Sequence, residues 1–196
     1  MEFKINHTNS LSAARYFGSF GIQNFGFSLD ALNPNHVSIH EAKQIIGWLY
    51  QPNIILEVGI FQKIEELDFL KEEIGFTSVE ISIHHPELDK IVERYKQNWI
   101  KMNFKEMEQF DFETEKYQES IFIIEIQQAE NNTQKIQQTA KNRLIFLDIK
   151  DGINTDEMIQ NSGISNLCIP CRKEVSVGNF DIEPYERFLP YLEGMN

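Results

Sequence analysis

The chain has 196 residues, of which 41% are hydrophobic, and this suffices for one globular domain with a substantial core. Its 30 Asp and Glu residues against 18 Lys and Arg give a net charge of −12, which disfavours binding to the phosphate backbone of a nucleic acid. The sequence contains no apolar run long enough to cross a membrane, and its first residues do not resemble a signal peptide, so we expect a soluble cytoplasmic protein that binds no membrane.

The first half of the chain alternates short apolar runs with amphipathic stretches. This pattern predicts four strand–helix pairs, with strands at 3–6, 24–29, 54–61 and 78–83 and helices at 11–20, 39–49, 64–74 and 86–96. Ser38 is followed three residues later by Glu41, a capping box that predicts the start of the second helix.

The second half repeats the pattern less clearly. Strands are predicted at 99–104, 121–126, 144–149 and 166–169, and helices at 133–141, 155–161 and 183–192. Residues 106–119 are acidic and weakly patterned, so the sequence does not define a fifth helix. Eight units at roughly 25-residue spacing predict an α/β fold with a parallel sheet, either a closed (βα)8 TIM barrel or an open doubly wound sheet. We favour the barrel, as a single compact domain over residues 1–196.

Polar residues stand at alternate positions near the predicted ends of the strands. Because the other face of each strand is apolar, we expect them to point inward at the C-terminal mouth of the barrel, where active sites of this fold lie. Two interpretations stay open: a pocket of mixed charge for a small polar metabolite, and a structural layer of ion pairs. The residues are Lys4, Asn6, Ser28, Asp30, Glu80, Ser82, His84, Lys101, Asn103, Lys105, Glu125, Gln127, Asp148 and Lys150.

The side chains that could hold a metal do not form a recognisable ligand motif. Cys168 and Cys171 make a C-x-x-C at a strand end without a second such pair, so we interpret them as packed cysteines. Glu80, Glu125 and Asp148 carry the oxygen atoms that a hard cation prefers, but nothing else in the sequence supports such a site. We predict neither a metal nor a cofactor.

Several motifs, taken in order along nearly the whole chain, resemble phosphoribosylanthranilate isomerase. Lys4-Ile5 resembles the opening of the family's K-I-C-G, residues 21–27 resemble G-A-D-x-x-G-F-x-F, and residues 33–38 and 58–61 resemble S-P-R-Y-V-S and V-G-V-F. In the second half, residues 152–156 resemble G-L-N-P-E, and Glu174, Gly178 and Asp181 match the spacing of the family's last motif. The resemblance implies a (βα)8 barrel and an Amadori rearrangement in tryptophan biosynthesis, which requires a general acid and a general base.

The resemblance also implies positions for the two catalytic groups. The family's basic cysteine falls at Asn6, whose amide is not basic, and His7 is the nearest substitute, although an extended strand would point it another way. The family's acid falls at Glu125, with Asp148 as the alternative register.

The substrate contacts implied by the resemblance are changed as well. Asn35 replaces an arginine that contacts the carboxylate end of the substrate, and Asp151-Gly152 replaces a Gly-Gly of the phosphate site. Cys171-Arg172 replaces the family's Ser-Gly after the eighth strand, and Arg172 and Lys173 carry positive charge that could compensate for the lost glycines.

We therefore predict a diverged member of the family, a pseudoenzyme that binds a small polar or phosphorylated metabolite at the mouth. An active isomerase with Glu125 as its acid, and a non-catalytic interaction or scaffold protein, remain alternatives. The sequence does not predict the oligomeric state.

Overall fold

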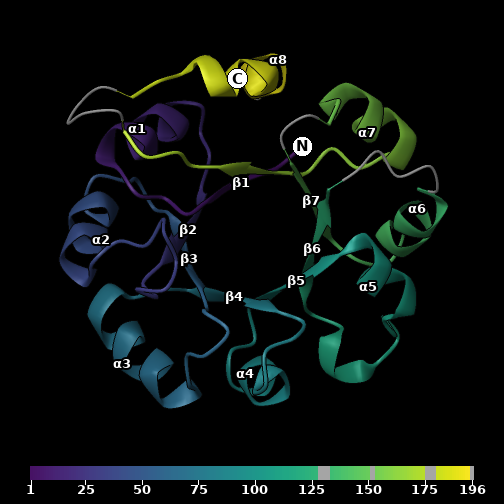
Figure 1. The fold of residues 1–196 in the computed structure, drawn as a ribbon, viewed down its shortest axis with the longest axis horizontal. Helices are drawn as coiled ribbons and strands as arrows, with labels where there is room; N and C mark the ends of the chain where they lie inside the picture. Colours follow the sequence, from purple (N-terminus) through teal and green to yellow (C-terminus); the bar gives the residue numbers. More distant parts are fainter. Residues whose placement is uncertain (128–132, 151–152, 175–179, 195–196) are drawn as a thin grey trace.

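Eight parallel strands close into a barrel in the computed structural model, which describes residues 1–127, 133–150, 153–174 and 180–194 (Figure 1). Each strand pairs with its neighbours in the chain, and the first strand pairs with the last, which confirms the predicted (βα)8 TIM barrel and excludes the open sheet. The strands are β1 (Phe3–Asn6), β2 (Asn24–Ser28), β3 (Asn53–Glu57), β4 (Ser78–Ser82), β5 (Asn98–Asn103), β6 (Ile121–Ile126), β7 (Ile145–Ile149) and β8 (Leu167–Pro170).

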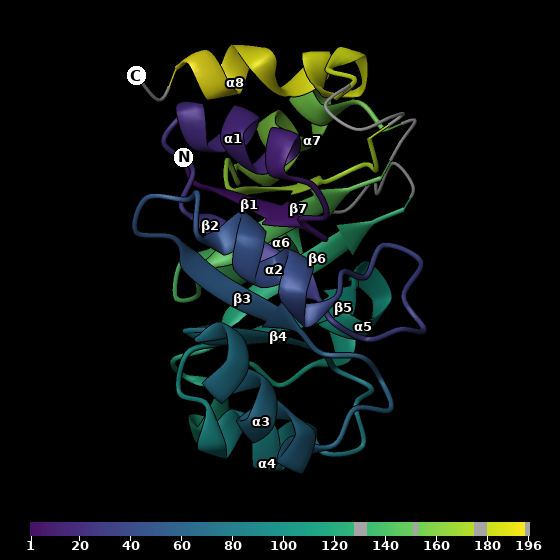
Figure 2. The same ribbon diagram turned by 90° about the vertical axis from the view of Figure 1, so that its left-hand side faces the viewer.

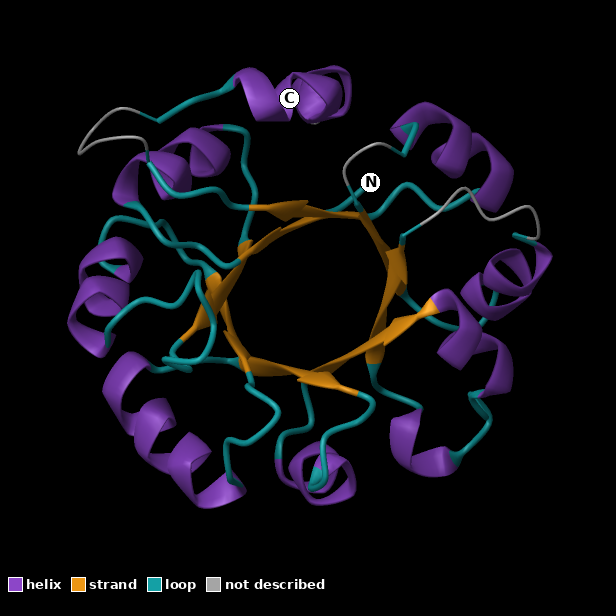
Figure 3. Cartoon of the chain, viewed as in Figure 1, coloured by secondary structure: helices purple, strands orange, loops and turns teal. Residues whose placement is uncertain are grey.

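The helices surround the barrel as an outer ring (Figure 3). Seen from the side, α8 lies next to α1 at the top of the view, and α3 and α4 lie at the bottom (Figure 2). None of the described helices is long and apolar enough to span a membrane. The helices are α1 (Leu11–Ser19), α2 (Ile39–Ile46), α3 (Ile64–Ile74), α4 (Leu88–Arg94), α5 (Phe104–Gln109), α6 (Gln134–Ala140), α7 (Thr155–Ser162) and α8 (Leu189–Glu193), with 3-10 helices η1 (Glu115–Tyr117) and η2 (Glu183–Phe188).

Local signals fix the ends of several helices. The predicted capping box of α2 is present: the Ser38 hydroxyl accepts from the Glu41 N–H, and the Glu41 carboxylate accepts from the Ser38 N–H. Gly75 and Gly163 end α3 and α7 in the left-handed conformation, with φ of 65° and 68°, which glycine adopts at little cost.

The third strand is shorter than the sequence predicts. It ends at Glu57 rather than at residue 61, because the chain then turns away to form a loop in which Gly59 donates its N–H to the Gln62 side chain. The predicted end at residue 61 was therefore wrong by four residues. This difference matters for the site, because it places Glu57 at the mouth of the barrel instead of in the middle of a strand.

The weakly patterned segment 106–119 is held by aromatic side chains. It contains the end of α5 and the short η1, and Phe112 between them packs edge-on against Phe122 of β6, with ring centroids 4.8 Å apart. Because this packing is made by single aromatic residues and not by a periodic face, the sequence pattern did not define the segment.

An apolar layer fills the lower half of the barrel, toward the amino ends of the strands. It consists of the buried side chains Ile55, Trp99, Ile123, Phe146 and Cys168. The rings of Trp99 and Phe146 lie 4.8 Å apart. The two cysteines are free and buried, as expected, and burial raises the pKa of the Cys171 thiol to about 12. Neither cysteine is therefore poised as a thiolate at neutral pH.

Candidate functional site

A charged layer lies above this apolar layer, at the carboxyl ends of the strands. Its members point inward and contact one another, which confirms the expected direction of these strand residues. We define the charged layer as His7, which follows β1, and Lys4, Glu57, Glu80, Lys101, Glu125, Asp148 and Lys150.

Lys4 forms the buried centre of the charged layer. Its Nζ lies 3.0 Å from Glu57 Oε1 and 2.6 Å from Glu80 Oε2, and it donates to Asn6 Oδ1 at 2.5 Å. Burial alone would lower the pKa of Lys4, but the attraction of Glu80 and Glu57 outweighs it and raises the pKa above the usual value. Burial likewise opposes the charge on Glu57, yet Lys4 and His7 hold its pKa well below the usual range. These groups therefore stay ionised in the interior.

A glycine in β2 makes room for this buried ion pair. A Cβ on Gly26 would lie 2.1 Å from Glu57 Oε1 and 2.7 Å from Lys4 Nζ, which is much closer than atoms can approach. Gly26 is flanked by Phe25 and Phe27, both buried in the hydrophobic core outside the barrel. The absence of a side chain at this one inward position is thus what allows Lys4 and Glu57 to meet.

Lys101 and Lys150 connect the remaining carboxylates nearer the mouth. Lys101 Nζ lies 3.0 Å from Asp148 Oδ2 and 3.2 Å from Glu125 Oε1, and Lys150 Nζ lies 2.8 Å and 3.1 Å from the same two atoms. Glu125 and Asp148 are direct neighbours across β6 and β7, so both candidate acid positions lie side by side. Burial opposes ionisation of Asp148, but Lys101 and Lys150 lower its pKa.

The ion pairs form one connected network across the mouth of the barrel. Lys101 also lies 3.8 Å from Glu80, which is paired with Lys4, so the inner and outer parts are linked through this carboxylate. The predicted layer of charges that satisfy each other is therefore present. Its outer members reach solvent at the mouth, since the side chains of Lys101, Glu125 and Lys150 are 20%, 23% and 42% exposed.

Asn6 and His7 both join this network. Asn6 is buried, and its Nδ2 lies 3.5 Å from Asp148 Oδ2. His7 has a φ of 53°, so it is not extended, and its ring approaches Glu57 Oε2 at 2.5 Å. The expectation that His7 would point away from the Asn6 side was wrong, because the chain leaves the strand directly after Asn6. Burial opposes the charged imidazolium, but Glu57 raises the pKa of His7 above its usual value.

The charged layer is balanced when His7 is protonated. It then holds four cations and four carboxylates, and with neutral His7 it carries one net negative charge. Each of Glu80, Glu125 and Asp148, which the sequence offered for a cation, has a lysine ammonium beside it. Within the described ranges, no group of three or more His, Cys, Asp or Glu side chains is placed to hold a metal ion.

Three other predicted ligand-binding residues, Asn35, Arg172 and Lys173, do not belong to the charged layer as defined above. Asn35 is half-buried in the loop between β2 and α2, where its N–H donates to Asn33 Oδ1 at 2.9 Å. The Arg172 N–H donates to the Tyr185 hydroxyl at 2.7 Å, and the side chains of Arg172 and Lys173 are exposed. Asp151 and Gly152 lie outside the described residues, so their part in an anion site stays a prediction.

Some of the predicted mouth residues have local structural roles. Asn103 caps α5 by accepting from the Glu106 N–H at 3.0 Å, and Glu106 in turn contacts His84 Nε2 at 2.5 Å. Ser82 accepts from the His84 N–H at 3.2 Å. These side chains stabilise the loops around the mouth rather than the interior of the barrel.

Sequence reasoning missed Glu57 and Gly26. The signal for Glu57 was its alternation with Ile55, which lies in the apolar layer of the same strand, but the overlong predicted strand hid it. The signal for Gly26 was a glycine inside a strand, which marks a close approach of another group.

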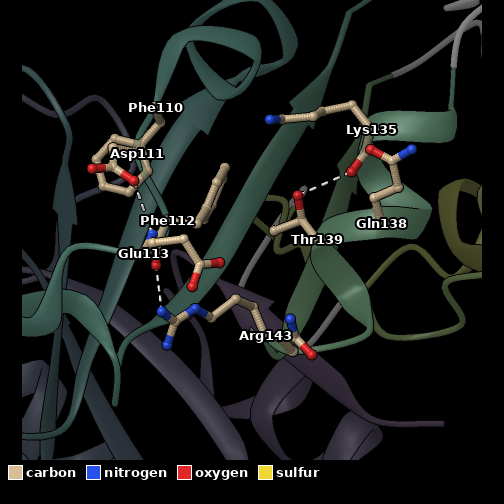
Figure 4. Close-up of a pocket in the computed structure, with 9 residues that line it drawn as sticks. Phe110, Asp111, Phe112, Glu113, Lys135, Gln138, Thr139 and Arg143 are labelled. Atoms are coloured by element: carbon tan, nitrogen blue, oxygen red, sulfur yellow. Dashed lines mark hydrogen bonds between the residues drawn. The ribbon is translucent and has the colours of Figure 1, made fainter.

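A separate cavity of about 210 Å³ lies outside the barrel, between α6 and the segment that follows α5 (Figure 4). Lys135 and Thr139 of α6 face Phe110–Glu113 across it. The Arg143 guanidinium donates to the backbone carbonyls of Phe112 and, at 2.7 Å, Gln118. Arg143 thus anchors the acidic segment to the barrel, and we assign this cavity no functional role.

The sequence matches no protein-family model and no curated protein. Among solved structures, the chain is similar to phosphoribosylanthranilate isomerase from Thermotoga maritima, with 15% identity over 99% of both chains and a TM-score of 0.74. It is also similar to TrpF from Jonesia denitrificans, with 15% identity over 100% of this chain and 98% of that one and a TM-score of 0.75.

A third similar structure is a phosphoribosylanthranilate isomerase in complex with reduced 1-(o-carboxyphenylamino)-1-deoxyribulose 5-phosphate, with 16% identity over 99% of both chains and a TM-score of 0.76. At this identity the likeness concerns the backbone fold, and fold alone does not establish an activity. The chain therefore has the barrel fold of phosphoribosylanthranilate isomerase, with a continuous network of ion pairs at its mouth.

Proposed function

We propose that this protein is a diverged relative of phosphoribosylanthranilate isomerase that does not catalyse the isomerisation and binds a small polar metabolite at the mouth of its barrel. The observation that carries the proposal is the charged layer, which contains the position of the family's acid at Glu125 and hydrogen-bonds to Asn6 at the position of the family's base. Its outer side chains, His7, Lys101, Glu125 and Lys150, are the groups that a ligand would meet.

The first support is the lack of a suitable base. Asn6 is a neutral amide held between Lys4 and Asp148, and an amide nitrogen has no useful basicity. The His7 ring lies against Glu57, which raises its pKa and so favours the imidazolium form, and this form has no free lone pair to remove a proton. A positioned base contributes about 10²–10⁴ in rate, so its loss is a large defect for proton abstraction.

The second support is the setting of the acid. Glu125 lies within 3.2 Å of Lys101 Nζ and 3.1 Å of Lys150 Nζ. Both ammonium groups approach the same oxygen, Oε1, so this carboxylate is engaged by two cations rather than presented to a sugar oxygen.

The argument for ligand binding is energetic. A buried network of ion pairs is often no more stabilising than apolar side chains of similar volume, because each charge loses its hydration. Buried charged groups that add little stability are typical of functional sites. Lys101 and Lys150 suit an anionic group of a ligand and Glu125 suits a hydroxyl group, so we favour a small metabolite that carries both.

The isomerase assay tests the first half of the proposal. We expect no turnover of phosphoribosylanthranilate by the purified chain, and no growth when the gene is introduced into a tryptophan auxotroph that lacks the isomerase. A phosphoribosylanthranilate isomerase with an intact K-I-C-G motif serves as the positive control. Growth of the auxotroph with this chain would overturn the proposal that the activity is lost.

A binding assay tests the second half. We expect calorimetry to detect binding of ribose 5-phosphate, which has an anionic group and hydroxyl groups, and Lys150→Met to weaken it. Lys141→Met is the matched control, because Lys141 is an exposed lysine just after α6 and not a member of the charged layer. Equal effects of the two variants, or no binding of ribose 5-phosphate, anthranilate or inorganic phosphate, would contradict a metabolite site at the mouth and favour the scaffold alternative.

A further inference from the structure

A second cavity, lined mostly by residues of polar types, lies at the end of the barrel opposite to the charged layer. Its volume is about 420 Å³, which is within the usual range for ligand sites, and it opens at the amino ends of β3 to β6. Trp99 of the apolar layer forms part of its lining, so this layer separates the cavity from the charged layer. Active sites of this fold lie at the carboxyl ends of the strands, whereas the amino ends contribute to stability. A cavity with polar residues at the amino ends therefore has to be explained separately.

Hydrogen bonds fix one wall of this cavity. Asn53, the first residue of β3, donates from Nδ2 to Asn24 Oδ1 at 2.9 Å. Its Oδ1 accepts from the hydroxyl groups of Thr77 and Ser78, the latter at 3.3 Å. The amide is therefore held at both ends, and the wall is preorganised before any ligand arrives.

A buried acceptor on the lining has no partner. Asn98 is 3% exposed, and its Nδ2 donates to the backbone carbonyls of Tyr95 and Lys96 at 3.1 and 3.3 Å. These two bonds fix the orientation of the amide, and its Oδ1 has no hydrogen-bond partner among the described residues. An unpaired buried acceptor destabilises the protein. This oxygen has no accessible surface in the free protein, so a bound molecule donates to it only after a small displacement of the lining.

The backbone at the edge of the cavity is also strained. Gln51 lines the cavity with a φ of 46°, in the left-handed region that residues other than glycine, asparagine and aspartate rarely adopt. Such strain is typical of ligand sites. Tyr50, which directly precedes Gln51, is 84% exposed, so an aromatic residue stands beside the polar lining in the chain.

The lining selects against anions. Glu119 is its one charged residue, and none of the described lining residues is a lysine, arginine or histidine. The amides, hydroxyls and unpaired acceptor suit a ligand that both donates and accepts hydrogen bonds. We propose that this cavity is a second binding site, distinct from the mouth, for a neutral polyhydroxylated molecule of the monosaccharide class.

Nuclear magnetic resonance titration of the whole chain tests this site. We expect D-glucose, D-ribose or myo-inositol to shift the amide signals of residues 51, 53, 77–78, 97–99 and 119–121, while the signals of the charged layer stay unchanged. Removing one hydrogen-bonding side chain with Asn98→Ala or Gln97→Ala should weaken binding about two- to tenfold. Gln97 is exposed and lines the cavity, so the result for Gln97→Ala decides the outcome if Asn98→Ala does not fold.

The matched control is Gln44→Ala, which removes an exposed glutamine of α2 that does not line the cavity. It should leave the affinity unchanged. The inference is overturned if none of the three probes shifts the cavity signals, if the shifts appear only at the mouth, or if Gln97→Ala and Gln44→Ala bind alike.

Discussion

The two layers that fill the barrel differ in how they contribute to the fold. The apolar layer, with the ring of Trp99 against Phe146, gains free energy from burial and depends little on the exact partner of each side chain. The charged layer gains free energy only while every member keeps its partner. The lower half of this barrel is therefore a tolerant core, whereas the upper half is intolerant of single changes.

The largest expected effect is the loss of the central cation. Lys4→Met leaves Glu57 and Glu80 buried without it, and should lower the free energy of unfolding by about 3–5 kcal/mol, measured by urea denaturation. Lys43→Met is the control, because Lys43 pairs with Glu73 at 2.6 Å on the surface and should cost less than about 1 kcal/mol. Equal losses in the two variants would contradict the central role of Lys4.

Filling the space beside the ion pair should have the next largest effect. Gly26→Ala places a methyl group where Glu57 and Lys4 meet, and we expect a destabilisation of about 1–3 kcal/mol from the forced displacement. Gly18→Ala is the control within α1, where the nearest atom lies 3.7 Å from the new Cβ, and it should be neutral or stabilising by up to about 1 kcal/mol. A Gly26→Ala variant as stable as the wild type would show that the ion pair has room to move.

A small deletion in the apolar layer should be cheaper. Ile123→Val removes one methylene group from this layer and should cost about 0.5–1.5 kcal/mol in thermal or urea unfolding. The cost should be the same at every pH, because no member that it touches in the layer ionises near neutrality. A cost that changes with pH would mean that the two layers are coupled.

The smallest expected effect is a pH dependence that arises from His7. Because its pKa is raised above the ordinary value of 6.5 on folding, its contribution to stability is complete below that value and is lost as the pH rises through the raised pKa. The urea midpoint of the wild type should therefore fall over this range. His7→Gln should remove this component, and an unchanged pH profile in that variant would assign the effect to another group.

The sequence was sufficient for the barrel because eight units with clear apolar periodicity leave few alternatives. The sequence also predicted correctly that five charged residues meet inside the barrel, because every second residue of a strand points inward. They are Lys4, Glu80, Lys101, Glu125 and Asp148. Glu57 was missed because a strand end depends on where the chain turns, and local pattern rules place such ends poorly.

The position of His7 was beyond prediction for a different reason. The sequence does not state the φ angle of a residue after a strand, and a left-handed residue reverses the expected side of its side chain. The role of Asn6 also depends on the fold, because the sequence does not show that its amide contacts Lys4 and Asp148.

The charged layer also has a consequence for the order of folding. Lys4 and Glu57 are separated by 53 positions, and Asn6 and Asp148 by 142, so these contacts of Lys4 and Asn6 form only when distant parts of the chain meet. Contacts of such long range are formed late, after the transition state, and then control how fast the native state opens. We expect Lys4→Met to accelerate unfolding far more than it slows refolding in stopped-flow measurements, which would make this layer the source of the protein's kinetic persistence.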